Sequence, residues 1–201
     1  TRWCVRSRGL GDVYKRQGWV CPGRPALAAD LARRDASLSH RGEGVHGAAF
    51  VAALGAAIPA AANLDEALDA ALEQIPGDSD AAGAVQLARR LAGSEDAVEQ
   101  LHRTYKDLSP VHTINNLAVV VWALCSAEDD FSAAIGNAVT AGWDTDCNGA
   151  TVGGLFGLRG SPIPDKWTQP WAGRIGVSLA GYQELQVEDV VQRTVETARS
   201  I

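Results

Sequence analysis

The sequence contains no long uninterrupted apolar run. A membrane-spanning helix needs about 18 consecutive apolar residues, and no stretch of this chain approaches that length. We therefore expect neither a membrane span nor a membrane partner. Residues 1–17 carry charges throughout and lack the apolar core of a secretory signal, so we expect a cytoplasmic protein.

Cysteine is scarce, and its spacing argues against two kinds of site. The four cysteines are Cys4, Cys21, Cys125 and Cys147, and no two of them form a CxxC pair. This spacing is typical neither of a structural zinc site nor of a disulfide scaffold. We expect the thiols to be reduced.

Charge is distributed unevenly along the 201 residues. Residues 1–17 carry a net charge of +4, and the rest of the chain holds 13 basic and 23 acidic residues, a net charge of −10. An acidic body argues against a nucleic-acid partner and suits a protein that handles cations. The basic stretch TRWCVRSRGLGDVYKRQ has two interpretations: a disordered nucleic-acid or targeting arm, or non-native, adapter-like sequence. We favour the second and expect native sequence from about Gly18.

Apolar periodicity predicts an all-α, single compact domain, because no alternating strand pattern of convincing length is present. A run of β-branched residues at 117–125 also suits a buried strand, but its length favours a helix. Residues 160–170 are expected to form a loop. The helices are predicted over 25–38, 43–58, 64–75 with Asn63 as cap, 80–92, a segment capped by Ser94, 111–127, 131–141 with Gly142 ending it, and 187–199.

The stretch GWDTDCNGATVGG, residues 142–154, places two aspartates one residue apart. Two carboxylates this close raise each other's pKa unless a cation or N–H donors compensate. We expect Asp144 and Asp146 to lie in a short connection that leads into a helix N-terminus, where Asp146 could simply serve as a cap. Glycines 149, 153 and 157 then form a bare stripe on one helix face, which predicts close packing there.

Paired carboxylates with nearby amide oxygens are suited to hard cations such as Mg²⁺, Mn²⁺ or Ca²⁺. Asp144, Asp146, Asn148 and Gly149 match the opening of an EF-hand calcium loop. The twelfth loop position, which should be a bidentate glutamate, is Leu155. A calcium loop is therefore disfavoured.

Three stretches together resemble the ADP-ribosylglycohydrolase family. They are SLSHRGEGVHGAAFVAAL at 37–54, HTINNLAVVVWAL at 112–124 and GWDTDCNGATVGGLFGLRG at 142–160. The resemblance implies an all-helical fold and hydrolysis of the glycosidic bond between ADP-ribose and an acceptor. It also implies two Mg²⁺ ions as cofactors, with Mn²⁺ as a possible substitute. The implied partner is an ADP-ribosylated protein or a small ADP-ribose conjugate.

The resemblance also implies roles for individual residues. Asp144 and Asp146 match the catalytic metal ligands of the family. Cys147 stands at the next ligand position, where the family usually has Thr or Ser, and a neutral thiol is a poor Mg²⁺ ligand. His40 matches a family histidine close to the substrate, although a hydrogen-bonded histidine at a helix boundary is an equally good interpretation.

Two further residues are candidates for substrate binding. Asn115 lies with His112 and Asn116 in an otherwise apolar segment, where buried polar groups need partners. It belongs either to a structural hydrogen-bond network or to a wall of the substrate pocket. Trp143, beside Asp144, could stack on adenine or could pack in the core.

The chain also departs from the family pattern. The other metal ligands of the family lie near the start of the domain, in an Asp-Asp-Thr and a Gly-Asp…Glu stretch, and residues 1–143 hold no counterpart. Asp129 and Asp130 precede a helix, where acidic caps are expected. We therefore expect residues 18–201 to be the C-terminal part of such a domain, missing its N-terminal helices and weak or inactive as a fragment. The alternative is a non-catalytic structural or binding relative, as among lens crystallins.

Overall fold

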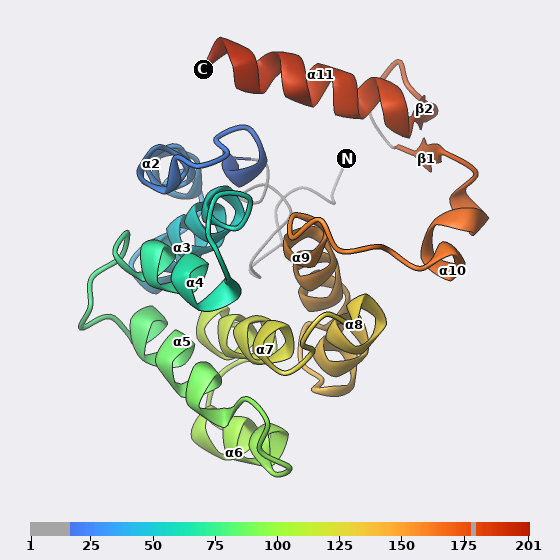
Figure 1. Cartoon of the computed structure of the whole chain (residues 1–201). Coiled ribbons are helices and arrows are strands. Elements are labelled where there is room, and N and C mark those ends of the chain that lie inside the picture. The colour runs from blue at the N-terminus through green and yellow to red at the C-terminus, as the bar shows by residue number, and fades with distance from the viewer. Residues whose placement is uncertain (1–16, 178–179) are drawn as a thin grey trace.

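The computed structural model describes residues 17–177 and 180–201, and these form a mostly helical domain (Figure 1). The all-α prediction is confirmed. The predicted arm at 1–17 lies outside the described residues except for Gln17, so it stays a prediction. The elements after the first turn are α2 (Pro25–Ala36), α3 (Glu43–Ala57), α4 (Leu64–Leu72), α5 (Asp80–Leu91), α6 (Ala97–Thr104), α7 (Thr113–Cys125), α8 (Phe131–Thr140), α9 (Thr145–Gly157), α10 (Asp165–Thr168), η1 (Gln169–Trp171), β1 (Arg174–Gly176), β2 (Glu184–Gln186) and α11 (Val187–Ser200).

Helices α3 and α7 form the centre of the domain. Every residue from 47 to 57 in α3 and from 113 to 124 in α7 is buried. A helix that is apolar on all sides must be covered on all sides. Accordingly, α2 and α4 pack on α3, and α5, α8 and α9 pack on α7. The helical interpretation of 117–125 is thereby confirmed.

The predicted cap of α4 is present. The side chain of Asn63 accepts a hydrogen bond from the N–H of Glu66 at 2.9 Å. The carboxylate of Glu66 in turn accepts the N–H of Ala62 at 2.8 Å. The first bond satisfies an N–H that the first helical turn leaves unpaired, and the second ties the residue before the cap to the same turn.

The prediction for Ser94 is wrong. Helix α6 is capped at Asp96, and the hydroxyl of Ser94 donates to the carboxylate of Asp96 at 2.6 Å instead of serving a helix N–H. The N–H of Ser94 is taken by the carbonyl of Leu91, so Ser94 belongs to the turn that ends α5.

Residues 160–170 are not wholly a loop, because α10 and η1 interrupt the segment. Pro164 precedes α10, and Asp165 begins it, a sequence that favours a helical turn. The indole N–H of Trp167 donates to the hydroxyl of Ser132 at 2.9 Å, and its ring meets that of Phe131 edge-on at 5.7 Å. These two contacts hold α10 against the start of α8.

The C-terminal segment lies at one edge of the molecule (Figure 1). Strands β1 and β2 form a two-stranded antiparallel sheet, too short for a periodic signal in the sequence. Helix α11 follows β2 directly, and the prediction of a last helix is confirmed. None of its residues is buried, and Val187, Val191 and Val195 remain exposed. Among the described residues, no helix is both long and apolar enough to cross a bilayer.

Two of the three glycines in the predicted stripe of α9 pack closely, whereas Gly157 is exposed. A Cβ atom at Gly149 would lie 3.3 Å from a methyl group of Val139, and one at Gly153 would lie 3.4 Å from Ile135. Both neighbours belong to α8. Bare glycines therefore let α8 and α9 approach more closely than side chains would allow.

Candidate metal centre

The turn between α8 and α9 carries the acidic residues. Gly142 has φ of +85° and ends α8 as predicted, and Trp143 follows with φ of +59°. A positive φ in a tryptophan is a strained conformation that its surroundings must hold. Asp144 then caps α9, and its carbonyl accepts the N–H of Asn148 at 2.9 Å.

One prediction about this turn is wrong in its boundaries. Helix α9 begins at Thr145, so Asp146 lies within the first turn and is not the cap, and Asn148 lies inside the helix. The two residues with positive φ complete the reversal of the chain, which lets the helix start earlier than expected.

Three side chains gather at this helix start. Asp144, Asp146 and Cys147 each offer one ligand atom, and these atoms all lie within 4.8 Å of one another. Asp144 and Cys147 are half-buried, whereas Asp146 is exposed. The group, which we call the acid cluster, therefore opens towards solvent on one side.

The pKa of the Asp144 carboxyl is raised above its ordinary value. Burial is the main cause, and the neighbouring Asp146 carboxylate acts in the same direction. Hydrogen bonding from Cys147 opposes the rise. The increase that the spacing of the two aspartates predicted is thus present at Asp144.

A buried asparagine of α7 is hydrogen-bonded to the turn that carries the acid cluster. Asn116 of α7 is fully buried, and its Oδ1 accepts the N–H of Asp144 at 3.2 Å and Nδ2 of Asn148 at 2.7 Å. Its own Nδ2 donates to the carbonyls of Pro110 and His112, both at 2.8 Å. One side chain thus joins the α6–α7 loop to the α8–α9 turn.

Asn148 provides a test of whether a cation fits here. It is fully buried, and its Oδ1 has no hydrogen-bond partner among the described atoms. An unpaired buried acceptor is costly unless a donor or a cation completes it. An amide oxygen from the first turns of α9, the helix start that also carries Asp144 and Asp146, is the kind of oxygen ligand that hard divalent cations prefer. The thiol of Cys147 does not match that preference.

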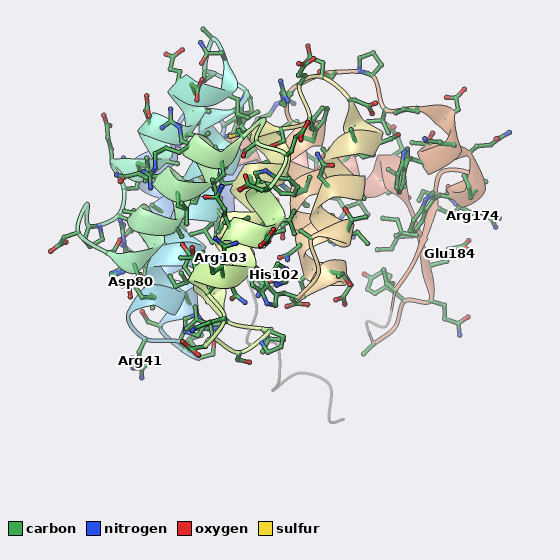
Figure 2. All side chains as sticks on the ribbon, turned by 90° about the horizontal axis from the view of Figure 1, so that it is seen from below. Arg41, Asp80, His102, Arg103, Arg174 and Glu184 are labelled. Carbon is green, nitrogen blue, oxygen red and sulfur yellow. The ribbon has the colours of Figure 1, made fainter. Side chains whose placement is uncertain are left out.

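A cleft of about 700 Å³ lies at the α6–α7 loop, and no residue of the acid cluster lines it. It lies between the starts of α3 and α5 and the α6–α7 loop, and its lining includes Glu43, Asp80, Tyr105, Asp107 and His112. Asp80, labelled in Figure 2, comes from the first turn of α5. Because Asn116 bonds both to the carbonyl of His112 and to the amide of Asp144, the wall of the cleft and the acid cluster share one support.

The fold and the acid cluster agree with a match to a known protein family. A family model described as ADP-ribosylglycohydrolase matches residues 17–198. The chain belongs to the ADP-ribosylglycohydrolase family. This membership supports a hydrolase of ADP-ribose linkages in general. No curated protein and no solved structure matches the chain.

In this ADP-ribosylglycohydrolase domain, His40 lies in the loop between α2 and α3. Its Nδ1 lies 2.8 Å from the hydroxyl of Ser39, and its ring packs on Gly44, where a Cβ atom would come within 2.9 Å of the ring. His40 is therefore a hydrogen-bonded histidine at a helix boundary, one of the two interpretations. Contact with substrate stays a prediction.

Trp143 is half-buried and packs against α6. Its ring stacks on His102, with centroids 4.1 Å apart and an interplanar angle of 21°. Nε2 of His102, labelled in Figure 2, lies 2.7 Å from the carbonyl oxygen of Ala141. One face of the indole is thus covered by protein, and stacking of adenine on it stays a prediction. No spacing in the sequence pointed to His102.

Asn115 is fully buried, and its Nδ2 donates to the carbonyl of Ser109 at 3.2 Å. With Asn116, it forms the structural hydrogen-bond network that was one interpretation of this polar pair. Through this bond Asn115 supports the α6–α7 loop. Its direct contact with substrate stays a prediction.

A testable prediction concerns the thiol of Cys125, which lies outside the acid cluster. Burial raises the pKa of the Cys125 thiol to about 11. Only the thiolate is alkylated, so the rate of its reaction with iodoacetamide should rise about tenfold per pH unit beyond pH 9. Mass spectrometry of the Cys125 peptide after timed alkylation measures this rate. A plateau near pH 9, as for a free thiol, would contradict the prediction.

Proposed function

We propose that the chain is part of a magnesium-dependent hydrolase that cleaves the glycosidic bond between ADP-ribose and an acceptor. The acceptor is a protein side chain or a small conjugate. The observation that carries the proposal is the convergence of Asp144 and Asp146 within 4.8 Å at the start of α9, in a chain of this family.

The chemistry of the donor set supports a hard cation. Asp144 is held at the helix cap with a raised pKa, so its charged form is disfavoured without a compensating positive charge. Asp146 adds a second carboxylate from the exposed side, and Asn148, two residues further along α9, carries an unpaired Oδ1. The positive end of the α9 dipole favours both carboxylates in their charged form.

These residues have distinct tasks in the proposed reaction. Asp144 and Asp146 would hold Mg²⁺, or Mn²⁺ in its place, and Cys147 would contribute little because thiols ligate magnesium poorly. Magnesium, when bound, would act as a Lewis acid, orient the ribose hydroxyls and activate water at the anomeric carbon. The cleft at the α6–α7 loop would receive the acceptor part of the substrate, and its carboxylates would favour polar or positively charged groups there.

The first experiment measures cation binding. Mn²⁺ titration, followed by electron paramagnetic resonance, should show binding to the chain that weakens at least about tenfold in the double variant Asp144→Asn and Asp146→Asn. The matched control is Asp129→Asn with Asp130→Asn, which removes the same charge from another pair of adjacent aspartates. Equal Mn²⁺ binding by both double variants and the parent chain would contradict the proposal.

The second experiment measures the reaction. In a longer form of the chain that carries further acidic ligands upstream, release of ADP-ribose from an ADP-ribosylated protein should depend on added Mg²⁺ and should cease in EDTA. The double variant at Asp144 and Asp146 should lose this release, whereas the control at Asp129 and Asp130 should keep it. Cation binding without any release would favour the alternative, a non-catalytic relative that retains the site.

A further inference from the structure

The backbone of Asp144 needs a support that its own turn does not supply. It follows Trp143, whose φ of +59° is strained, and it occupies the N-cap position of α9. An N–H in this position has no partner within the helix. The amide of Asp144 finds its acceptor 28 residues earlier in the chain, at Oδ1 of Asn116.

We propose that Asn116 is a positioning residue, which fixes Asp144 relative to the α6–α7 loop and thereby sets the cation affinity of the acid cluster. The proposal rests on the proposed function, because it assumes that Asp144 holds a cation. Asn116 acts through the backbone of Asp144 and does not itself touch the bound group.

The hydrogen bonds of Asn116 suit this role because they leave no alternative orientation. Its Oδ1 accepts two bonds, from the N–H of Asp144 and from Nδ2 of Asn148, and its Nδ2 faces two carbonyl oxygens. Rotation of the amide by 180° would place its oxygen against the carbonyls of Pro110 and His112 at 2.8 Å. A fully buried side chain with each polar atom doubly bonded holds a rigid geometry.

The same bonds define what each substitution removes. Asn116→Leu replaces the amide with an apolar group of similar size and leaves the amide of Asp144 and Nδ2 of Asn148 without their acceptor. Asn116→Asp retains an acceptor but turns a second oxygen towards the carbonyls of Pro110 and His112. Both variants release the turn from the loop, through different chemical defects.

Asn115→Leu is the matched control. Asn115 is the adjacent residue of the same helix and is equally buried. Its Nδ2 donates to the carbonyl of Ser109 at 3.2 Å, its Oδ1 accepts Nδ2 of Asn116 at 3.5 Å, and neither bond reaches the α8–α9 turn. Its replacement therefore disturbs α7 and the loop but leaves in place the two bonds that Oδ1 of Asn116 accepts, including the one from the amide of Asp144. A general loss of stability would affect both variants alike.

The test uses two measurements on the whole chain. Hydrogen exchange followed by NMR reports the protection of the Asp144 amide, and Mn²⁺ titration reports cation affinity. Asn116→Leu and Asn116→Asp should each lower both the protection and the affinity by about tenfold, whereas Asn115→Leu should change neither, even where it lowers the melting temperature equally.

Three results would be informative in different ways. Unchanged protection and Mn²⁺ affinity in a folded Asn116 variant would overturn the inference while leaving the proposed function intact. Equal losses in the Asn115 and Asn116 variants would also overturn it, since the role would then be merely structural. If Asp144→Asn with Asp146→Asn leaves Mn²⁺ binding unchanged, the proposed function fails, and with it the role of Asn116 in cation affinity. If Asn116→Leu does not fold, Asn116→Ala serves as the second apolar variant.

Discussion

Replacing Phe156 by alanine is expected to lower the free energy of unfolding by about 3–5 kcal/mol, the range found for truncating large buried aromatic residues. Phe156 is fully buried on α9. Its ring meets that of Phe131 edge-on at 5.7 Å, and the guanidinium of Arg159 lies 4.7 Å from its centroid. Alanine would remove both contacts and leave a cavity between α8 and α9. Urea unfolding followed by circular dichroism measures the change.

Trp171→Ala is the control for this prediction, because Trp171 is a larger aromatic residue that is 57% exposed. Its replacement should change the free energy of unfolding by no more than about 0.5 kcal/mol. Phe156→Leu should fall between the two, since it retains most of the buried volume. A loss below about 1 kcal/mol for Phe156→Ala would show that α9 does not pack as described.

Much of the fold was predictable because its signals are local. Uniformly apolar helices must be central, and the sequence of α3 and α7 shows this directly. The cap at Asn63 depends on a residue only three positions away. The two-stranded sheet escaped prediction because each strand has three residues, which is too few for a periodic pattern. Ser94 was misassigned because its hydroxyl has a closer acceptor in Asp96.

The candidate site likewise has a part that local sequence predicts and a part that it does not. The spacing of Asp144 and Asp146 within one short segment predicted that their carboxylates lie together, and the structure brings them together with Cys147. The support of this cluster was not predictable, since Asn116 joins it across 28 residues of sequence. No local pattern reports which buried amide will face which turn, because tertiary packing alone decides it.

The glycine stripe links packing to this site, and Gly149→Leu is the sharpest test of the link. A Cβ atom at Gly149 would already lie 3.3 Å from a methyl group of Val139 and 3.9 Å from one of Ile135. A leucine must therefore push α9 away from α8. Overpacking of this kind costs about 1–3 kcal/mol, which outweighs the gain of about 0.8–1 kcal/mol in helix propensity when glycine is replaced. We expect a net decrease in the free energy of unfolding, measured by urea denaturation.

Ala150→Leu is the matched control, because Ala150 is the next residue of α9 and is exposed. It introduces a leucine into the same helix without pressing on α8, so its free energy of unfolding should stay within about 0.5 kcal/mol of the parent value. Gly149→Leu should also weaken Mn²⁺ binding. Gly149 is the neighbour of Asn148 and lies close in sequence to the acid cluster, so a shift of α9 would move the carboxylate of Asp146 away from Asp144, which Asn116 holds in the turn. If Gly149→Leu lowers stability but leaves Mn²⁺ affinity unchanged, the packing of α8 on α9 and the geometry of the acid cluster are independent.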